Sequence, residues 1–168
     1  KKGGINCDVL LMSATPIPRT MMMSHYGDMD VSKITEKPSA RKKITTLSKP
    51  EKKINELWNF LTKQIAEKNQ IFWVCPLIEE SKFLDFSSAK KKFDLINNKF
   101  PNKVGLIHGS LNKEEKEKVL KRFLEEKISI LVSTTVIEVG IDFPNANVII
   151  IENANKFGLA QLHQLRGR

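Results

Sequence analysis

Short runs of apolar, largely β-branched residues recur along this chain, and they limit its fold more than any other feature. The runs lie at residues 9–12, 44–47, 71–75, 104–107, 128–132 and 148–151. Each run is nearly continuous, without alternating polar residues, which is typical of strands buried on both faces of a parallel sheet. The pattern therefore predicts a buried parallel sheet.

Segments with helical spacing separate these runs, at residues 51–68, 89–100 and 113–126. In the first segment, Ile54, Leu57 and Leu61 recur at intervals of three and four residues, which predicts one apolar helical face. Asn112 and Glu115 have the spacing of a capping box at the start of the third segment. Alternating strands and helices predict right-handed crossovers and an α/β fold: a doubly wound parallel sheet with helices on both faces.

Residues 16–43 interrupt this alternation with Pro16, Pro18, Gly27 and Pro38. We expect an interdomain linker there. Residues 1–15 are then the end of a preceding domain with its last strand, and residues 44–168 form a second domain. Since the sequence starts without an initiator methionine and ends at Arg168, we expect a piece of a longer protein.

Charge is unevenly distributed over the 168 residues, which carry 28 Lys and Arg against 19 Asp and Glu, a formal net charge of +9. Residues 36–53 hold seven basic residues against two acidic ones, a candidate contact for a polyanion. Residues 113–127 are nearly balanced, which is typical of a solvated helix face. No apolar run approaches the roughly 20 residues of a membrane span. Cys7 and Cys75 lack a partner spacing, so we expect small buried hydrophobic residues in a reducing compartment and no metal site.

Polar residues follow several predicted strands, and ligands of parallel α/β sheets bind at the carboxyl ends of strands. The candidates are Ser13, Ala14 and Thr15; His108 and Gly109; Thr134, Thr135, Glu138, Gly140 and Asp142; and, farther on, Gln164, Arg166 and Arg168. Each also has a structural explanation. Hydroxyls can satisfy backbone groups at a strand end, His108-Gly109 can form a turn, and arginines are favoured in the last turn of a helix. Their joint occurrence, in this order, favours function.

The same residues carry a resemblance to superfamily 2 helicases. Ser13-Ala14-Thr15 resembles motif III, residues 134–142 resemble motif V, and residues 164–168 resemble the first part of motif VI. The longer strings at residues 13–20 and 158–168 narrow the resemblance to the RecG and transcription-repair coupling factor families. Residues 26–30 and 73–81 are similar to the RecG family. The resemblance covers nearly the whole chain.

This resemblance implies a fold and a function. It implies a RecA-like second motor domain at residues 44–168, truncated within motif VI, of an ATP-dependent double-stranded-DNA translocase. Such a motor regresses stalled forks and migrates branched junctions in repair and recombination, in the bacterial cytoplasm and at the nucleoid. The partners are then branched DNA and the first RecA-like domain of the same chain, with no membrane.

The resemblance also assigns roles to residues. Arg168, with Gln164 and Arg166, is expected to act in catalysis at the γ-phosphate, and Gly140 and Asp142 to approach the nucleotide. Thr134, Thr135, His108 and Gly109 are expected to contact DNA phosphates. Ser13, Ala14, Thr15 and Glu138 are expected to couple hydrolysis to movement. Arg19, which follows two prolines, can pair with a DNA phosphate or a carboxylate, or be a plain surface arginine.

A phosphate loop of the form GxxxxGK[ST] and an acidic magnesium motif are both absent from the sequence. We therefore expect ATP and Mg²⁺ as cofactors, with the Mg²⁺ ligands in the first motor domain, and no ATP hydrolysis by this segment alone. Two alternatives stay open: the motor of a transcription-repair coupling factor, and a non-catalytic nucleic-acid-binding α/β module. A nucleophilic hydrolase is disfavoured because no GxSxG elbow is present.

Overall fold

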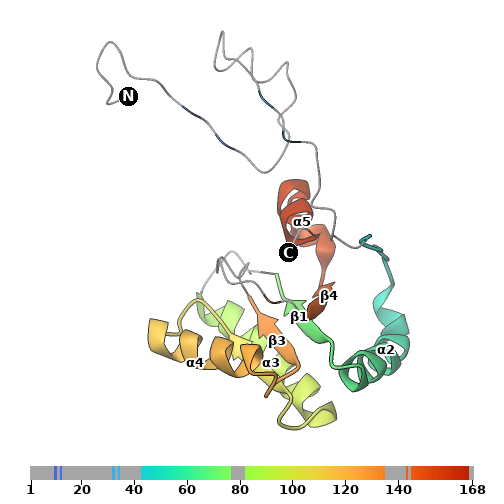
Figure 1. The fold of residues 1–168 in the computed structure, drawn as a ribbon, viewed down its shortest axis with the longest axis vertical. Helices are drawn as coiled ribbons and strands as arrows, with labels where there is room; N and C mark the ends of the chain where they lie inside the picture. Colours follow the sequence, from blue (N-terminus) through green and yellow to red (C-terminus); the bar gives the residue numbers. More distant parts are fainter. Residues whose placement is uncertain are drawn as a thin grey trace.

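A four-stranded, wholly parallel sheet is the centre of the computed structural model, which describes residues 10, 12, 32, 34, 43–76, 82–134, 143 and 145–166. The strands are β1 (Gln70–Val74), β2 (Val104–Ile107), β3 (Ile130–Ser133) and β4 (Ala146–Ile151), in the spatial order β2-β3-β1-β4 (Figure 1). The predicted parallel α/β sheet is confirmed.

The strand register brings all four carboxyl ends to one edge. Ile71 of β1 lies opposite Ile130 of β3 and Val148 of β4, and Ile107 of β2 lies opposite Ser133. The central strands β1 and β3 are almost entirely buried, as their continuous apolar runs predict. We call the edge where the strands begin the amino edge and the opposite one the carboxyl edge.

Helices cover both faces of this sheet, as predicted. Their bounds are η1 (Glu51–Lys53), α2 (Ile54–Ala66), α3 (Lys82–Lys99), α4 (Lys113–Leu124), η2 (Ala154–Lys156) and α5 (Leu159–Arg166). On one face, Leu61 of α2 and Ile96 of α3 pack around Trp73 of β1. On the other, Leu120 and Phe123 of α4 pack against alternate strand residues. The two clusters bury apolar surface, the main stabilising term in folding.

Local signals explain where these helices begin and end. The Asn112 side chain accepts a hydrogen bond from Glu115 N at 2.8 Å, and the Glu115 carboxylate accepts one from Asn112 N at 3.2 Å, so the predicted capping box is confirmed. After α2, Lys68 adopts the left-handed conformation (φ 61°), and Asn69 N bonds Gln64 O at 2.9 Å. This Schellman-type ending turns the chain directly into β1.

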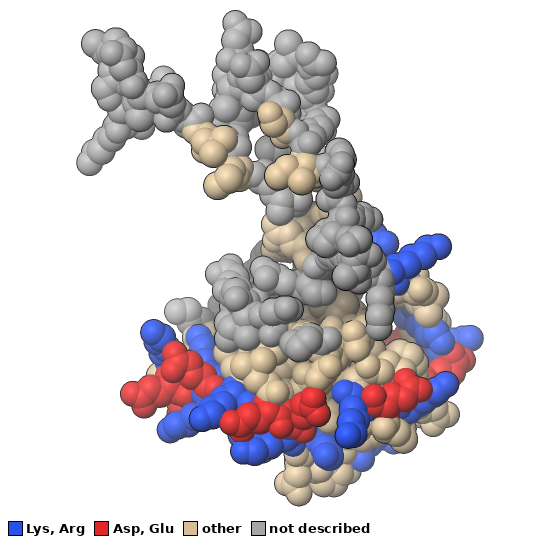
Figure 2. Space-filling view, in the orientation of Figure 1, with Lys and Arg blue, Asp and Glu red and all other residues tan. Residues whose placement is uncertain are grey.

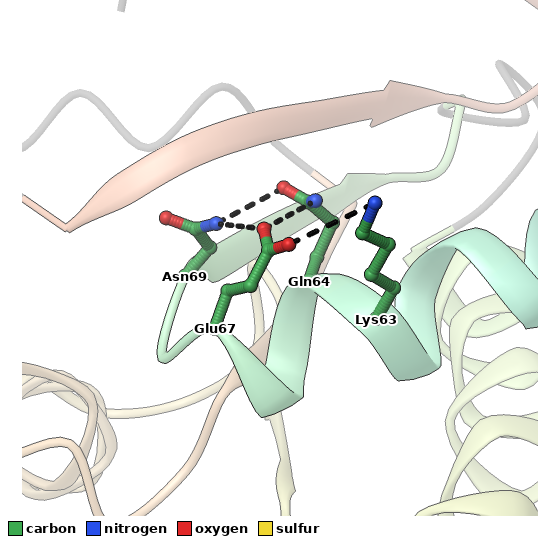
Figure 3. A network of polar contacts seen from close by, with 4 residues as sticks. All are labelled: Lys63, Gln64, Glu67 and Asn69. Atoms are coloured by element: carbon green, nitrogen blue, oxygen red, sulfur yellow. Dashed lines mark hydrogen bonds and ion pairs between the residues drawn. The ribbon is translucent and has the colours of Figure 1, made fainter.

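The amino edge holds a network of paired polar side chains, which we call the amino-edge network: Lys63, Gln64, Glu67, Asn69 and Asn147. Asn69 Nδ2 donates to Gln64 Oε1 at 3.1 Å, and Gln64 Nε2 donates to Glu67 Oε2 at 3.1 Å (Figure 3). Asn147 at the start of β4 donates to Asn69 Oδ1 at 2.7 Å. The network therefore ties the end of α2 to the start of β4.

Some predicted elements differ from the structure. Residues 43–50 form no regular element, and Ile44 and Leu47 are 40% and 76% exposed, so the strand predicted at residues 44–47 is wrong. A β-branched segment becomes a strand only when a neighbour completes its hydrogen bonds, and none of the described strands pairs with it. Leu10 and Met12, the described part of the strand predicted at 9–12, are likewise exposed and outside a strand.

Helix α3 begins at Lys82, seven residues before the predicted start at residue 89. Ser87 and Ser88 weaken the helical pattern, but serine is tolerated in a helix held by tertiary contacts. The predicted domain boundaries at residues 15/16 and 43/44 stay predictions, because most of residues 1–42 lie outside the described part. None of the described helices is long and apolar enough to span a membrane.

Candidate functional site at the carboxyl edge

The structure brings two of the predicted DNA-binding positions together. His108 and Thr134 are the first residues after β2 and β3, whose last residues, Ile107 and Ser133, lie opposite one another. Thr134 N donates to Ile107 O at 3.3 Å, which extends the ladder by one residue. The backbones of His108 and Thr134 therefore lie side by side at the carboxyl edge.

Thr134 carries a buried hydroxyl. The residue is 2% exposed, and its Oγ1 has no hydrogen-bond partner among the described residues. A buried hydroxyl without a partner costs free energy of about 1–3 kcal/mol, so such groups are rare and often functional. The Thr134 hydroxyl is therefore suited to bond a group that this part of the chain does not provide.

His108 is half-buried beside the start of α4. Burial lowers its pKa below the ordinary value, Glu115 opposes this shift, and Lys116 adds to it. Burial therefore favours the neutral imidazole. His108 O also accepts a hydrogen bond from Leu111 N at 3.2 Å, so the turn reading of this segment applies too. A Cβ placed at Gly109 would meet no described atom within 4 Å, so the described part of the chain leaves this backbone open.

A second group of polar residues, which the sequence analysis missed, lies where β1 and β4 end. We call Trp73, Cys75, Lys92 and Glu152 the Glu152 cluster. Glu152 Oε1 pairs with Lys92 Nζ at 2.6 Å, and Glu152 Oε2 accepts hydrogen bonds from Trp73 Nε1 at 3.1 Å and Cys75 Sγ at 3.7 Å. Glu152 directly follows an apolar strand, so its position in the sequence could have identified it in the same way as the other polar residues at strand ends.

Cys75 in this cluster is an inert thiol. Burial raises its pKa to about 12, and the negative charge of Glu152 acts in the same direction. A protonated thiol is a poor nucleophile and a poor metal ligand. Cys75 is also 2% exposed, so the expected buried hydrophobic role is confirmed for this cysteine, while Cys7 lies outside the described residues.

Helix α5 carries two of the predicted catalytic residues beyond the carboxyl end of β4 (Figure 1). Gly158 directly precedes the helix, and its N donates to Gln161 Oε1 at 3.0 Å. Leu165 is the buried residue of α5, whereas Gln164 and Arg166 are exposed. One apolar side chain of the helix is therefore buried, and the polar residues on either side of it are exposed.

The other predicted site residues lie outside the described residues: Ser13, Ala14, Thr15, Arg19, Thr135, Glu138, Gly140, Asp142 and Arg168. Their roles stay predictions. Within the described ranges, no three His, Cys, Asp or Glu residues form a group that could hold a metal ion.

Charged side chains of both signs are intermixed along the lower part of the face shown in Figure 2. On α4, Lys113–Glu117 and Lys121–Glu125 are exposed pairs at 4.0 Å, which confirms the solvated helix face predicted for this segment. Part of the basic charge of residues 36–53 is also paired, because Lys49 Nζ lies 2.6 Å from Glu56 Oε2. Lys49 and Lys53 hold the pKa of Glu56 below its ordinary value. Within its described part, this basic stretch is partly neutralised.

Comparisons with known proteins agree with this architecture. The model of the helicase conserved C-terminal domain matches residues 52–168. The chain is 52% identical over 163 residues to the ATP-dependent DNA helicase RecG of Thermotoga maritima, covering 96% of this chain and 21% of that protein. It is 45% identical over 167 residues to the RecG of Bacillus subtilis, covering 98% of this chain and 24% of that protein.

A solved structure is similar as well. The structure of RecG bound to a three-way DNA junction superposes with a TM-score of 0.73 at 48% identity, covering 94% of this chain and 20% of that chain. The present chain therefore spans about a fifth to a quarter of the relatives it matches.

Proposed function

Because this chain belongs to the helicase conserved C-terminal domain family, we propose that it is the second motor domain of an ATP-dependent helicase that remodels branched double-stranded DNA. Its likeness in both sequence and fold to RecG bound to a three-way DNA junction carries this proposal. The full-length protein would regress stalled forks and migrate junctions in repair and recombination, on nucleoid DNA in the bacterial cytoplasm.

In this proposal ATP binds between two motor domains. The sequence has no phosphate loop, so the first motor domain holds the phosphates and the Mg²⁺ ion. Phosphoryl transfer is catalysed mainly by positioning and by neutralising developing charge. The exposed Gln164 and Arg166 on α5 suit contacts to phosphate oxygens, and Arg168 would stabilise the γ-phosphate charge. Gly140 and Asp142 would approach the nucleotide from motif V.

The DNA contacts in this proposal lie where β2 and β3 end. The buried Thr134 hydroxyl, Thr135, His108 and the open backbone at Gly109 would bond phosphate oxygens, and Arg19 would add a further charge. Contacts to phosphates fix the register of a protein on a duplex without reading its sequence. This property suits a motor that steps along any DNA.

Coupling between hydrolysis and stepping is assigned to Ser13, Ala14 and Thr15, with Glu138 of motif V. Pro16 and Pro18 follow the first group directly. Proline fixes its own φ and restricts the residue before it. A stiff link of this kind would pass a small displacement from one motor domain to the other.

Replacement of Thr134 and Thr135 by Val in the full-length protein tests the DNA assignment. Valine keeps the shape and removes the hydroxyls, so binding to branched DNA should weaken equally for all sequences. Junction unwinding should fall without a loss of folding stability. Thr62→Val is the control, because the Thr62 hydroxyl bonds Trp58 O of its own helix at 3.0 Å. Unchanged binding and unwinding in the double variant would contradict the assignment.

A further inference from the structure

The Glu152 cluster contains an ion pair that differs from the others among the described residues. Lys92 and Glu152 are 20% and 23% exposed in their side chains, whereas the side chains of the other pairs are 38% to 90% exposed. Both carboxylate oxygens of Glu152 are used, because Trp73 and Cys75 bond the oxygen that Lys92 does not pair with. The Lys92 ammonium also lies 5.6 Å from the centre of the Trp73 ring. Residues of α3 and β1 thus meet the carboxylate of the residue that directly follows β4.

Glu152 is also the point at which the chain leaves the sheet. Its backbone N donates to Val74 O at 2.9 Å, one residue beyond the end of β4. Asn153 follows in the left-handed conformation, at φ 48°, which asparagine tolerates better than most residues. The short helix η2 then leads to α5. The direction of this connection is set at Glu152 and Asn153.

Among the described residues, helix α5 has a single buried side chain. Leu165 is the buried residue of the helix, and Leu159 at its start is 86% exposed. One buried leucine restrains a helix of eight residues weakly in tilt and rotation. Its orientation therefore depends on the connection that begins at Glu152.

We propose that Glu152, held by Lys92 and Trp73, is a positioning residue that sets the orientation of α5 at the carboxyl edge. The consequence for turnover rests on the proposed function, because it requires that α5 face the nucleotide. Removing either member of a partly buried ion pair leaves a charge without its partner. Either change removes the ion pair that holds residue 152 to α3. A misplacement of about 1 Å at a reacting centre can cost on the order of 10²-fold in rate.

The test uses the full-length protein with Glu152→Gln and Lys92→Met. The matched controls are Asp94→Asn and Lys90→Met, since Lys90 and Asp94 form an exposed pair at 3.0 Å on the same helix. Each test variant should lower kcat for DNA-stimulated ATP hydrolysis about tenfold. The KM for ATP and the affinity for junction DNA should change less than about twofold. A tilt of α5 would displace Arg166 from the nucleotide, and such a displacement mainly weakens contacts made in the transition state. The control variants should retain the full rate.

The orientation of α5 is measured independently by electron-electron double resonance between spin labels. One label is placed at His163 of α5 and the other at Lys91 of α3, both exposed, with other reactive cysteines replaced. Glu152→Gln should broaden the distance distribution, and Asp94→Asn should leave it unchanged. An unchanged distribution in Glu152→Gln would overturn the positioning role. A broadened distribution with normal kcat would support the positioning role and contradict the proposed nucleotide-facing role of α5.

Glu152→Asp covers the case in which Glu152→Gln does not fold. Aspartate keeps the charge and shortens the reach by one methylene. We expect a broadening and a loss of kcat that both lie between the wild type and Lys92→Met. Wild-type values of both quantities in Glu152→Asp and in Lys92→Met would overturn the inference.

Discussion

The two edges of the sheet use similar polar residues in opposite ways. At the amino edge, the Asn69 side chain bonds that of Gln64 (Figure 3) and also that of Asn147. At the carboxyl edge, the buried hydroxyl of Thr134 has no partner in the described part of the chain, and Gln164 and Arg166 are exposed. The polar side chains of the amino edge bond one another, whereas the carboxyl edge has exposed polar side chains on α5 and a buried hydroxyl that no described residue bonds.

Connections at the two edges differ in the same sense. At the amino edge, helices α2, α3 and α4 turn back into strands through short connections that contain a left-handed residue each, Lys68, Asn102 and Glu126. These connections have three to five residues, whereas the connections from β1 to α3, from β2 to α4 and from β4 through η2 to α5 have five to seven. Short pinned turns serve folding, while longer connections carry function on a rigid scaffold. We therefore expect amino-edge changes to affect stability and carboxyl-edge changes to affect activity.

The largest effect is expected at Arg168. In the full-length protein, Arg168→Ala should lower DNA-stimulated turnover by about 10³-fold, in the range of other arginine fingers, while DNA binding survives. Arg168→Lys should restore little, because lysine lacks the planar guanidinium. Steady-state ATPase assays measure this effect. Asn69→Ala at the amino edge is the control and should leave turnover unchanged. A near-normal rate in Arg168→Ala would remove this residue from the mechanism.

A change at Gln70, at the amino edge, should lower stability and leave turnover unchanged. Gln70 is 4% exposed, and its amide nitrogen donates to Phe123 O and to Ile128 O, the latter at 3.4 Å. Gln70→Leu leaves both carbonyl groups without this donor, so the free energy of unfolding should fall by about 1–3 kcal/mol. Urea denaturation measures the loss. The turnover of the folded fraction should stay normal. A reduced kcat in fully folded protein would contradict the expectation that amino-edge changes affect stability alone.

Thr134→Val should separate function from stability within one residue. Since its hydroxyl is buried without a described partner, a methyl group of the same shape should raise the free energy of unfolding by about 1 kcal/mol. The same change should weaken DNA binding. Thermal unfolding and DNA titration on one preparation measure both quantities. A loss of stability would show that the hydroxyl has a structural partner.

The smallest effect concerns pH at His108. Because its pKa is lowered by burial, the folded state binds this proton less readily than the unfolded state does. His108 therefore has little effect on the free energy of unfolding above a pH of about 6.5. It lowers that free energy as the pH falls further. His108→Gln should flatten the decline in stability between about pH 7 and pH 5, and denaturation at both values measures it. His163→Gln, on exposed α5, is the control, and an equal change in both variants would contradict the assignment.

Much of this comparison was predictable from the sequence. Continuous apolar runs predicted the buried parallel strands, and the shared carboxyl edge predicted that His108 and Thr134 lie close together. Asn112 and Glu115 predicted the start of α4 because a capping box is local. Residues 44–47 were mispredicted because strand formation depends on a distant partner. The pairing of Lys92 with Glu152 follows from the order of the strands, which one sequence without homologues does not reveal.

The central claim is that ligands bind at the carboxyl edge and leave the amino edge unchanged. Hydrogen-deuterium exchange of the full-length protein, with and without branched DNA and a non-hydrolysable ATP analogue, tests it most directly. The account predicts protection in peptides covering residues 104–111, 130–134 and 152–166. Peptides covering residues 63–70, 99–103 and 124–129 should exchange at unchanged rates. Protection of the amino-edge peptides, with none at the carboxyl edge, would contradict the account.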